Sequence, residues 1–307
     1  MAKSNGPPDR LRGVVTLALA WWLFQASVGC TLRGGPEGEG PGRRPQMLAL
    51  TPEQELELGR EAYQEILAKA DVLPPDHPAV DRVRRVGSRL VAAIRIRLLL
   101  QEINLREEGY RFEWEFNVID SDRINALCLP AGKVAVFTGL LAFVRSDDEL
   151  ATVLGHEMAH AVAHHASERL ALNPAAAEAL RAAGGRLSDV DEPHRRSLLG
   201  LLDAGAALEG LSYNRFQESE ADHIGVFLMT FAGYDPEAAL DFWERMREAS
   251  SGSIRLPEIL SNHPTDARRL AQLRVWVPLA EGGKRAYDRG EVAPGPPAKG
   301  ILESRRR

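Results

Sequence analysis

Cysteine is scarce in this sequence: the 307 residues contain only two, Cys30 and Cys128. Two cysteines cannot build the disulfide framework on which many small secreted domains depend. A basic stripe is also missing and the formal net charge of -5 is mild, so no nucleic-acid partner is expected. After residue 30, no apolar run reaches the roughly 20 residues of a membrane-spanning helix. With 44% apolar residues, the chain can nevertheless bury the core of a large domain.

The first thirty residues have the three-part layout of a secretory signal. Basic residues precede an apolar stretch from Val14 to Phe24, and small residues then lead to Cys30. A cysteine in this place resembles the lipidation site of a bacterial lipoprotein, so residues 1–30 are predicted to be a signal or lipoprotein anchor. An uncleaved membrane anchor and plain secretion are the alternatives. All three place the folded domain outside the cytoplasm, facing the periplasm or the exterior.

The composition divides the rest of the chain into a folded domain between two flexible segments. Residues 31–48 are rich in Gly, Pro and Arg and are predicted to form a tether, and residues 288–307 a disordered tail. The domain at 49–287 is expected to be α+β, mostly helical with a small sheet. One helix is expected to begin at Thr51, and five others to cover 79–103, 146–169, 195–230, 236–250 and 265–275. Strands are expected at 111–119 and 133–138.

The strongest chemical signal is His156-Glu157-Met158-Ala159-His160. Residues four apart share one face of a helix, so both imidazoles can reach one Zn²⁺ ion. Glu157 lies beside them and is suited to accept a proton from the attacking water of a metalloprotease. Such a short pattern also arises by chance, so its weight depends on a third ligand elsewhere in the chain.

A third ligand is expected from a second helix, and the acidic segment at 218–222 is the best candidate. Glu218 and Asp222 are four apart and share a face, whereas Glu220 points elsewhere. One of the pair can bind the metal while the other accepts the spare N–H of a ligand histidine. A solvated acidic helix face is the alternative. His164 is a weaker candidate, because one straight helix rarely offers three ligands to a tetrahedral metal.

Taken together, five blocks resemble the HtpX and CAAX prenyl protease family of zinc metallopeptidases. The resemblance best fits the branch that is not embedded in the membrane, which includes periplasmic lipoproteins, BepA-like proteins and the mitochondrial inner-membrane protease. The blocks occur in the order of the family between about Leu50 and Leu273. They are Asn125–Gly139, His156–His160, Tyr213–Gly225, Phe231–Pro236 and Ser261–Pro264 with Arg269.

The resemblance implies a gluzincin-type zincin fold with one zinc ion per chain. It assigns His156, His160 and Glu218 as ligands, Glu157 as the catalytic base and Asp222 as the partner of a ligand histidine. These assignments agree with the choice of Glu218 over Glu220 made from the residues alone.

The resemblance also implies that His263 lies near the metal. Pro264 restrains His263 to an extended backbone, which can aim its imidazole into a cleft. The side chain either occupies the fourth position on the metal and keeps the resting enzyme quiet, or donates to the oxyanion formed during attack. A loop histidine that caps a helix is the third possibility.

The segment Lys133–Thr138 is predicted to be an edge strand beside the zinc helix. An extended substrate could pair with the backbone of Lys133, Val134, Ala135 and Val136, which would tolerate many sequences. An ordinary structural strand is the alternative. Cys128 just before it is interpreted as a buried small hydrophobe and not as a redox group.

The function indicated is a zinc metalloendopeptidase in quality control of misfolded or unassembled envelope and membrane proteins. A chaperone-like assembly factor with a dormant zinc site is the alternative, although an intact Glu157 favours the enzyme. Another zinc hydrolase, such as an aminopeptidase, has less support, since no residue marks recognition of a free N-terminus. The expected partners are unfolded or misassembled proteins and, through the N-terminal anchor, a membrane.

Overall fold

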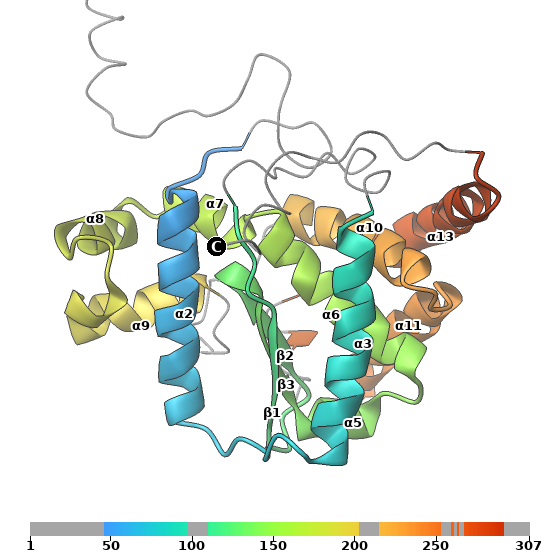
Figure 1. Cartoon of the computed structure of the whole chain (residues 1–307), viewed down its shortest axis with the longest axis horizontal. Coiled ribbons are helices and arrows are strands. Elements are labelled where there is room, and N and C mark those ends of the chain that lie inside the picture. The colour runs from blue at the N-terminus through green and yellow to red at the C-terminus, as the bar shows by residue number, and fades with distance from the viewer. Residues whose placement is uncertain are drawn as a thin grey trace, which may run out of the picture.

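A computed structural model describes residues 46–96, 110–202, 215–252 and 267–291, together with 259, 260 and 263. The predictions for residues 1–30, for Cys30 and for most of the tether and tail lie outside these residues. None of the described helices combines the length and the apolar composition that a membrane span needs. The fold is mostly helical around one small sheet (Figure 1), as expected.

Three short strands form the sheet, in the order β1-β3-β2. Strand β1 (Glu115–Ile119) pairs in parallel with β3 (Lys133–Phe137), and β2 (Ala126–Leu129) pairs with β3 in antiparallel register. The turn between β2 and β3 is the 3₁₀ segment η2 (Pro130–Gly132). Ala131 and Gly132 both have positive φ there, which lets the chain reverse within three residues.

The prediction of an edge strand at Lys133–Thr138 is therefore wrong. Strand β3 lies in the middle of the sheet, its five residues are all buried, and its backbone is paired on both sides. Lys133, Val134, Ala135 and Val136 thus have no free edge to offer a substrate. Strand β3 is not an edge strand because β2, which is joined to it through the turn η2, runs back along it and lies between β3 and the helix that carries the His156–His160 motif. Four residues without polar alternation gave no sign of that strand.

Alternate residues of the strands enter two different cores, one on each face of the sheet. One core contains Phe116, Cys128 and Val134 and is completed by apolar residues of five long helices. The other contains Leu127, Ala135 and apolar residues of four further helices. Cys128 is buried, as expected of a small hydrophobe.

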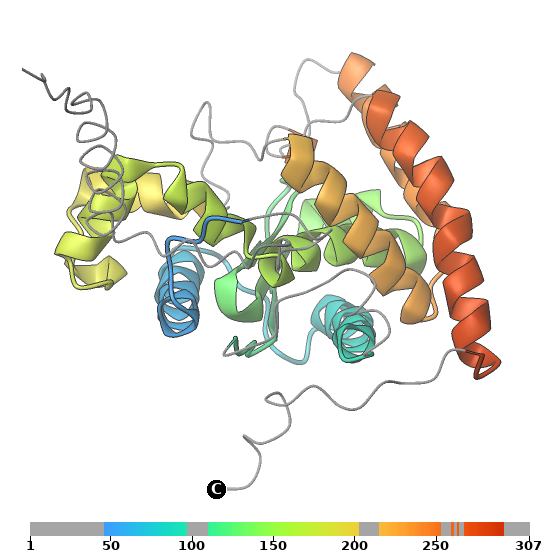
Figure 2. The same ribbon diagram turned by 90° about the horizontal axis from the view of Figure 1, so that it is seen from above.

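The two groups of helices extend to opposite ends of the molecule (Figure 2). The helices of the first core are α3 (Pro78–Ile94), α6 (Asp147–Val162), α10 (Arg215–Phe231), α11 (Glu237–Gly252) and α13 (Ala267–Asp288). Those of the second are α2 (Pro52–Ala68), α7 (His165–Ala171), α8 (Pro174–Ala182) and α9 (Glu192–Leu201). The short segments α5 (Thr138–Phe143) and η3 (Leu187–Asp189) complete the described elements.

Helix α6 runs through the centre of the molecule, and every residue from Glu149 to Val162 is buried. Its first turn is capped by Ser146, whose hydroxyl accepts from the backbone N–H of Glu149. The Glu149 carboxylate also accepts two hydrogen bonds of 2.7 Å from the Arg245 guanidinium on α11. A helix that is buried on all sides and tied at its start provides a rigid support for the side chains it carries.

Helices α6 and α10 cross at two glycines, Gly155 and Gly225. A Cβ atom added to Gly225 would lie 2.9 Å from the His156 backbone nitrogen and 3.0 Å from the Gly155 carbonyl carbon. The crossing is therefore close because neither residue has a side chain. This contact sets how near the acidic residues of α10 come to the histidines of α6.

Gly225→Ala is expected to destabilise the protein by about 1–3 kcal/mol, because the methyl group meets backbone atoms that cannot rotate away. Gly282→Ala on α13 is the matched control, since a Cβ there meets nothing within 4 Å. It should instead stabilise the helix by about 0.5–1 kcal/mol through helix propensity. Denaturant unfolding of both variants measures the two effects. Equal stability of the two variants would contradict a tight α6–α10 crossing.

Candidate metal centre

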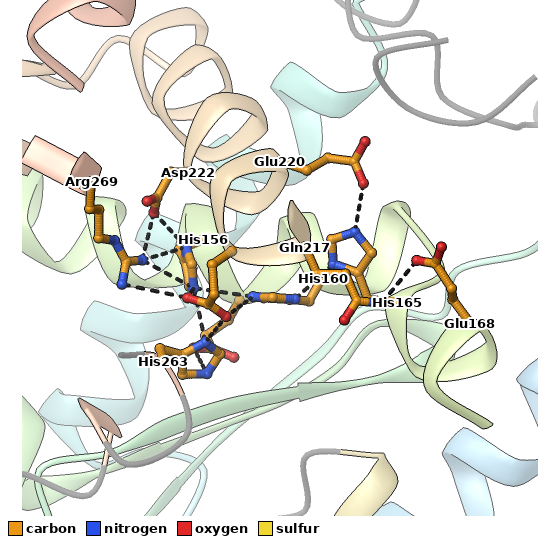
Figure 3. Close-up of polar contacts among 11 residues, drawn as sticks. His156, His160, His165, Glu168, Gln217, Glu220, Asp222, His263 and Arg269 are labelled. Atoms are coloured by element: carbon orange, nitrogen blue, oxygen red, sulfur yellow. Dashed lines mark hydrogen bonds and ion pairs between the residues drawn. The ribbon is translucent and has the colours of Figure 1, made fainter. Parts of the chain in front are cut away.

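The two histidines of the motif point from one face of α6 toward the same point (Figure 3). His156 Nε2 lies 3.1 Å from His160 Nε2, and both residues are buried, with relative exposures of 2%. Their spacing of four residues on an unbroken helix accounts for this convergence.

Glu218 on α10 and His263 complete a buried cluster around that point. Glu218 Oε2 lies 3.5 Å from His156 Nε2, and Glu218 Oε1 lies 3.5 Å from His160 Nε2. His263 Nδ1 lies 2.8 Å from Glu218 Oε1 and 3.1 Å from His156 Nε2. One potential ligand atom from each of the four residues lies within 4.8 Å of the other three. The structure thus brings together the three predicted ligands and the predicted loop histidine.

The chemistry of this cluster fits a zinc ion. His156 Nδ1 contacts Asp222 Oδ1 at 2.9 Å, so its proton lies on Nδ1 and its lone pair on Nε2. That lone pair faces the nitrogen of His160, an arrangement that a shared cation would stabilise. Glu218 Oε2 is buried and makes no hydrogen bond among the described residues. Two imidazole nitrogens and one carboxylate are a usual ligand set of catalytic zinc.

Asp222 and Arg269 both contact the ring of His156 at Nδ1. Arg269 Nη2 donates to Asp222 Oδ1 at 2.6 Å, and the guanidinium carbon lies 3.5 Å from the centre of the Trp243 ring. Arg269 Nη1 also lies 3.5 Å from Glu218 Oε2. Arg269 thereby links the carboxylate of Asp222 to that of Glu218. The sequence placed Arg269 in the last motif but gave no role for it or for Trp243.

Burial sets the charge states of the cluster. It lowers the pKa of His156 and of His160 well below the ordinary value, with Arg269 adding to the effect at His156 and His156 at His160. Both rings are therefore neutral at pH 7 and able to bind a cation. Burial alone would raise the pKa of Glu218, but the nearby His263 brings it below the ordinary value. For Asp222, burial raises the pKa and Arg269 opposes that rise.

Glu157 lies beside the cluster, fully buried on α6. Its Oε1 is 3.3 Å from His263 Nε2. A carboxylate in this place can accept a proton from a water molecule next to the ligands. Among the residues that the structure describes, Glu157 and His263 are therefore placed to act on a substrate at this point.

The remaining histidines and acids near the motif lie outside the cluster. His164 Nδ1 contacts Glu55 Oε2 at 2.8 Å, and its ring lies 3.7 Å from that of Tyr110. Glu220 Oε2 contacts His165 Nε2 at 2.9 Å and does not face the cluster. The sequence did not predict that His165 contacts His160, because on an unbroken helix the two residues would not face each other.

Comparison with known proteins agrees with this geometry. The model of peptidase family M48 matches residues 84–277. The mitochondrial metalloendopeptidase OMA1 of Schizosaccharomyces pombe is 34% identical over 238 residues, which are 76% of this chain and 64% of that protein. The human metalloendopeptidase OMA1 is 33% identical over 65% of this chain and 39% of its own length.

A bacterial relative is the beta-barrel assembly-enhancing protease of Escherichia coli, 27% identical over 72% of this chain and 43% of its own length. The chain thus spans less than two thirds of the length of these relatives. The peptidases of the matched family are metal-dependent, which is consistent with the buried cluster of donors. With the family model covering most of the folded domain, this chain belongs to peptidase family M48.

Proposed function

We propose that this chain is a zinc-dependent metalloendopeptidase that cleaves misfolded or unassembled proteins of the cell envelope. The observation that carries this proposal is the buried set of His156, His160 and Glu218 with the carboxylate of Glu157 beside it. The relatives support the same class, because two are named metalloendopeptidases and one an assembly-enhancing protease.

His156, His160 and Glu218 would hold the metal, and Glu157 would serve as general base. When bound, a zinc ion would polarise the scissile carbonyl and make water a better nucleophile. Glu157 would accept the proton of the attacking water and then deliver it to the leaving amine. Asp222 fixes the ring of His156 through Nδ1, and Arg269 holds Asp222 in turn. An assembly role is the second candidate, because the bacterial relative is named a beta-barrel assembly-enhancing protease.

His263 is proposed to act as a gate that keeps the resting site quiet. Its Nδ1 lies among the ligand atoms and its Nε2 lies 3.3 Å from Glu157 Oε1, so the ring stands where a water molecule has to be activated. This position supports a role of His263 as a gate more than a role as hydrogen-bond donor to the oxyanion. A donor to the oxyanion would have to lie on the far side of the water molecule.

Under the gate proposal, His263→Ala should raise basal cleavage of an unfolded protein, by about tenfold for each 1.4 kcal/mol of closing contact removed. If His263 instead donates to the oxyanion, the same change should lower the rate by about 10²–10³-fold. Initial rates on unfolded casein separate the two. His194→Ala, a change at a half-exposed histidine of α9, is the control and should leave the rate unchanged.

We also propose that Cys30 carries lipid and anchors the chain to a membrane, with the catalytic domain outside the cytoplasm. One acyl chain binds membranes weakly, so stable attachment needs a multiply acylated cysteine. Cys30→Ser should therefore abolish lipid anchoring, and the protein should appear in a soluble form or as the unprocessed precursor. Mass spectrometry of the mature protein measures the modification directly, and an unmodified Cys30 would contradict the proposal.

A further inference from the structure

Helix α6, which carries the zinc motif, ends in a break that brings the side chain of His165 back into contact with His160. On a continuous helix, five residues correspond to a rotation of about 140° away from His160. Helix α6 instead ends at Val162, and His164 adopts a left-handed conformation with φ 57° and ψ 31° before α7 begins at His165. As a result, His165 Nδ1 lies 2.8 Å from His160 Nδ1.

The surroundings hold this break in place. The left-handed conformation is uncommon for a residue other than glycine, so it needs support from tertiary contacts. Glu55 on α2 contacts the His164 ring at 2.8 Å, and the Gln46 amide donates to the Ala163 carbonyl at 2.8 Å. Strained backbone that is held by several contacts is typical of functional sites. The break at His164 is therefore expected to do more than connect two helices.

The second ring nitrogen of His165 faces α10. His165 Nε2 lies 2.9 Å from Glu220 Oε2, and the His165 side chain is fully buried while that of Glu220 is 10% exposed. A chain of contacts thus runs from His160 through His165 to Glu220 (Figure 3).

The proton positions along this chain follow from its end at a carboxylate. Glu220 accepts, so the proton of a neutral His165 lies on Nε2 and its Nδ1 is an acceptor. The contact between the two Nδ1 atoms then requires His160 to donate from Nδ1. His160 is thereby left with its lone pair on Nε2, the atom that faces the ligand cluster. The opposite order would put the lone pair of His165 against the Glu220 oxygen and a proton on the ligand atom of His160.

We propose that His165 and Glu220 are positioning residues that fix the ring and the tautomer of His160 for zinc binding. This inference rests on the zinc site proposed above. Helix α10 would then orient both ligand imidazoles. Asp222 contacts His156 directly, and Glu220 supports His160 through His165. Partners of this kind orient a ligand and make it more basic, and their loss typically costs about 10–100-fold in metal affinity.

The test is the zinc affinity of full-length variants, measured by competition with a chromophoric chelator. His165→Leu should weaken zinc binding by about 10–100-fold. His165→Asn should recover much of that loss, because the Asn side-chain oxygen can accept from His160 Nδ1. Glu220→Leu should also weaken binding, whereas Glu220→Gln, which keeps an acceptor, should weaken it less. The visible spectrum of the Co²⁺ form gives a second readout, since a misplaced His160 changes the ligand geometry.

The matched control is Glu168→Ala on α7. Glu168 accepts from the Gln217 amide of α10 at 2.9 Å, so this change removes a contact between the same two helices other than that of His165 with Glu220. Its zinc affinity should stay near that of the wild type. Wild-type affinity in His165→Leu, or in Glu220→Leu if the former does not fold, would overturn the inference. An equal loss in His165→Asn and His165→Leu would also overturn it. A wild-type protein that binds no zinc would instead refute the proposed function itself.

Discussion

Replacing Glu157 by Gln is expected to reduce cleavage of an unfolded protein by about 10²–10⁴-fold, the usual contribution of a general base. The amide has the shape of the carboxylate but cannot accept a proton from water. Glu157 is fully buried on the central helix, so no other group of α6 can move into its place without disturbing the core. The effect should appear in kcat, because a general base acts in the chemical step and not in substrate binding.

The Glu157→Gln protein should retain zinc and unfold at the same temperature, since the ligands are untouched. This separates a lost base from a lost metal or a lost fold. The same variant distinguishes the two candidate functions, because an assembly factor with a dormant site would keep its full effect on client proteins. Turnover close to that of the wild type would remove Glu157 from the mechanism.

Replacing Glu218 by Ala is expected to empty the metal site. Glu218 supplies the only carboxylate of the four-residue ligand cluster, and its oxygens lie 3.5 Å from the nitrogens of both His156 and His160. Without it the cluster retains two imidazoles of α6 and the loop histidine, with no anionic ligand to balance the charge of the metal. Zinc per chain, measured by atomic absorption, should fall from about one to near zero.

Thermal unfolding provides an independent measure of the same change. A ligand present at about 1,000 times its Kd stabilises the folded state by about 4.1 kcal/mol. Added zinc should therefore raise the Tm of the wild-type protein and leave that of Glu218→Ala unchanged. Glu220→Ala, two residues along the same helix, is the comparison variant. Because Glu220 reaches His160 through His165, this variant should bind zinc more weakly but still hold about one ion when the metal is in excess. The opposite result, with Glu220→Ala empty and Glu218→Ala full, would contradict the assignment.

The placement of the metal cluster follows from helical spacing and was therefore open to prediction. Residues four apart lie on one face, so the sequence alone pairs His156 with His160, and Glu218 with Asp222. The residues alone made the second pair the best candidate for the third ligand, with a solvated acidic face as the alternative, and the family resemblance then assigned Glu218 to the metal. The glycines that allow the approach, Gly155 and Gly225, were not recognised, because a glycine inside a helix gives no sign of which backbone it meets.

Other features depended on tertiary contacts and were missed. Nothing in the residue types around Ala163 and His164 marks the end of a helix, so 146–169 was expected to be continuous. The residues that contact the break, Glu55 and Gln46, lie more than a hundred residues away in sequence. The contacts of His165 with His160 and Glu220 were missed for the same reason.

A proline and a short strand account for two further errors. Helix α13 was expected to end near residue 275, but it continues to Asp288 although Pro278 removes one backbone donor inside it. Burial of Val277 and Ala280 on either side offsets that loss. Strand β2 went unrecognised because its four residues are all buried and show no alternation, and its absence led to the wrong edge for the sheet.

The central claim is that one zinc ion held by this cluster is responsible for cleavage of protein substrates. The most direct test measures zinc content and the rate of unfolded-casein cleavage on one preparation of the protein, before and after removal of metal by a chelator and during stepwise return of zinc. The rate should fall to background as zinc is removed and rise linearly until about one ion is bound per chain. Cleavage that continues at the original rate in the zinc-free protein would contradict the claim.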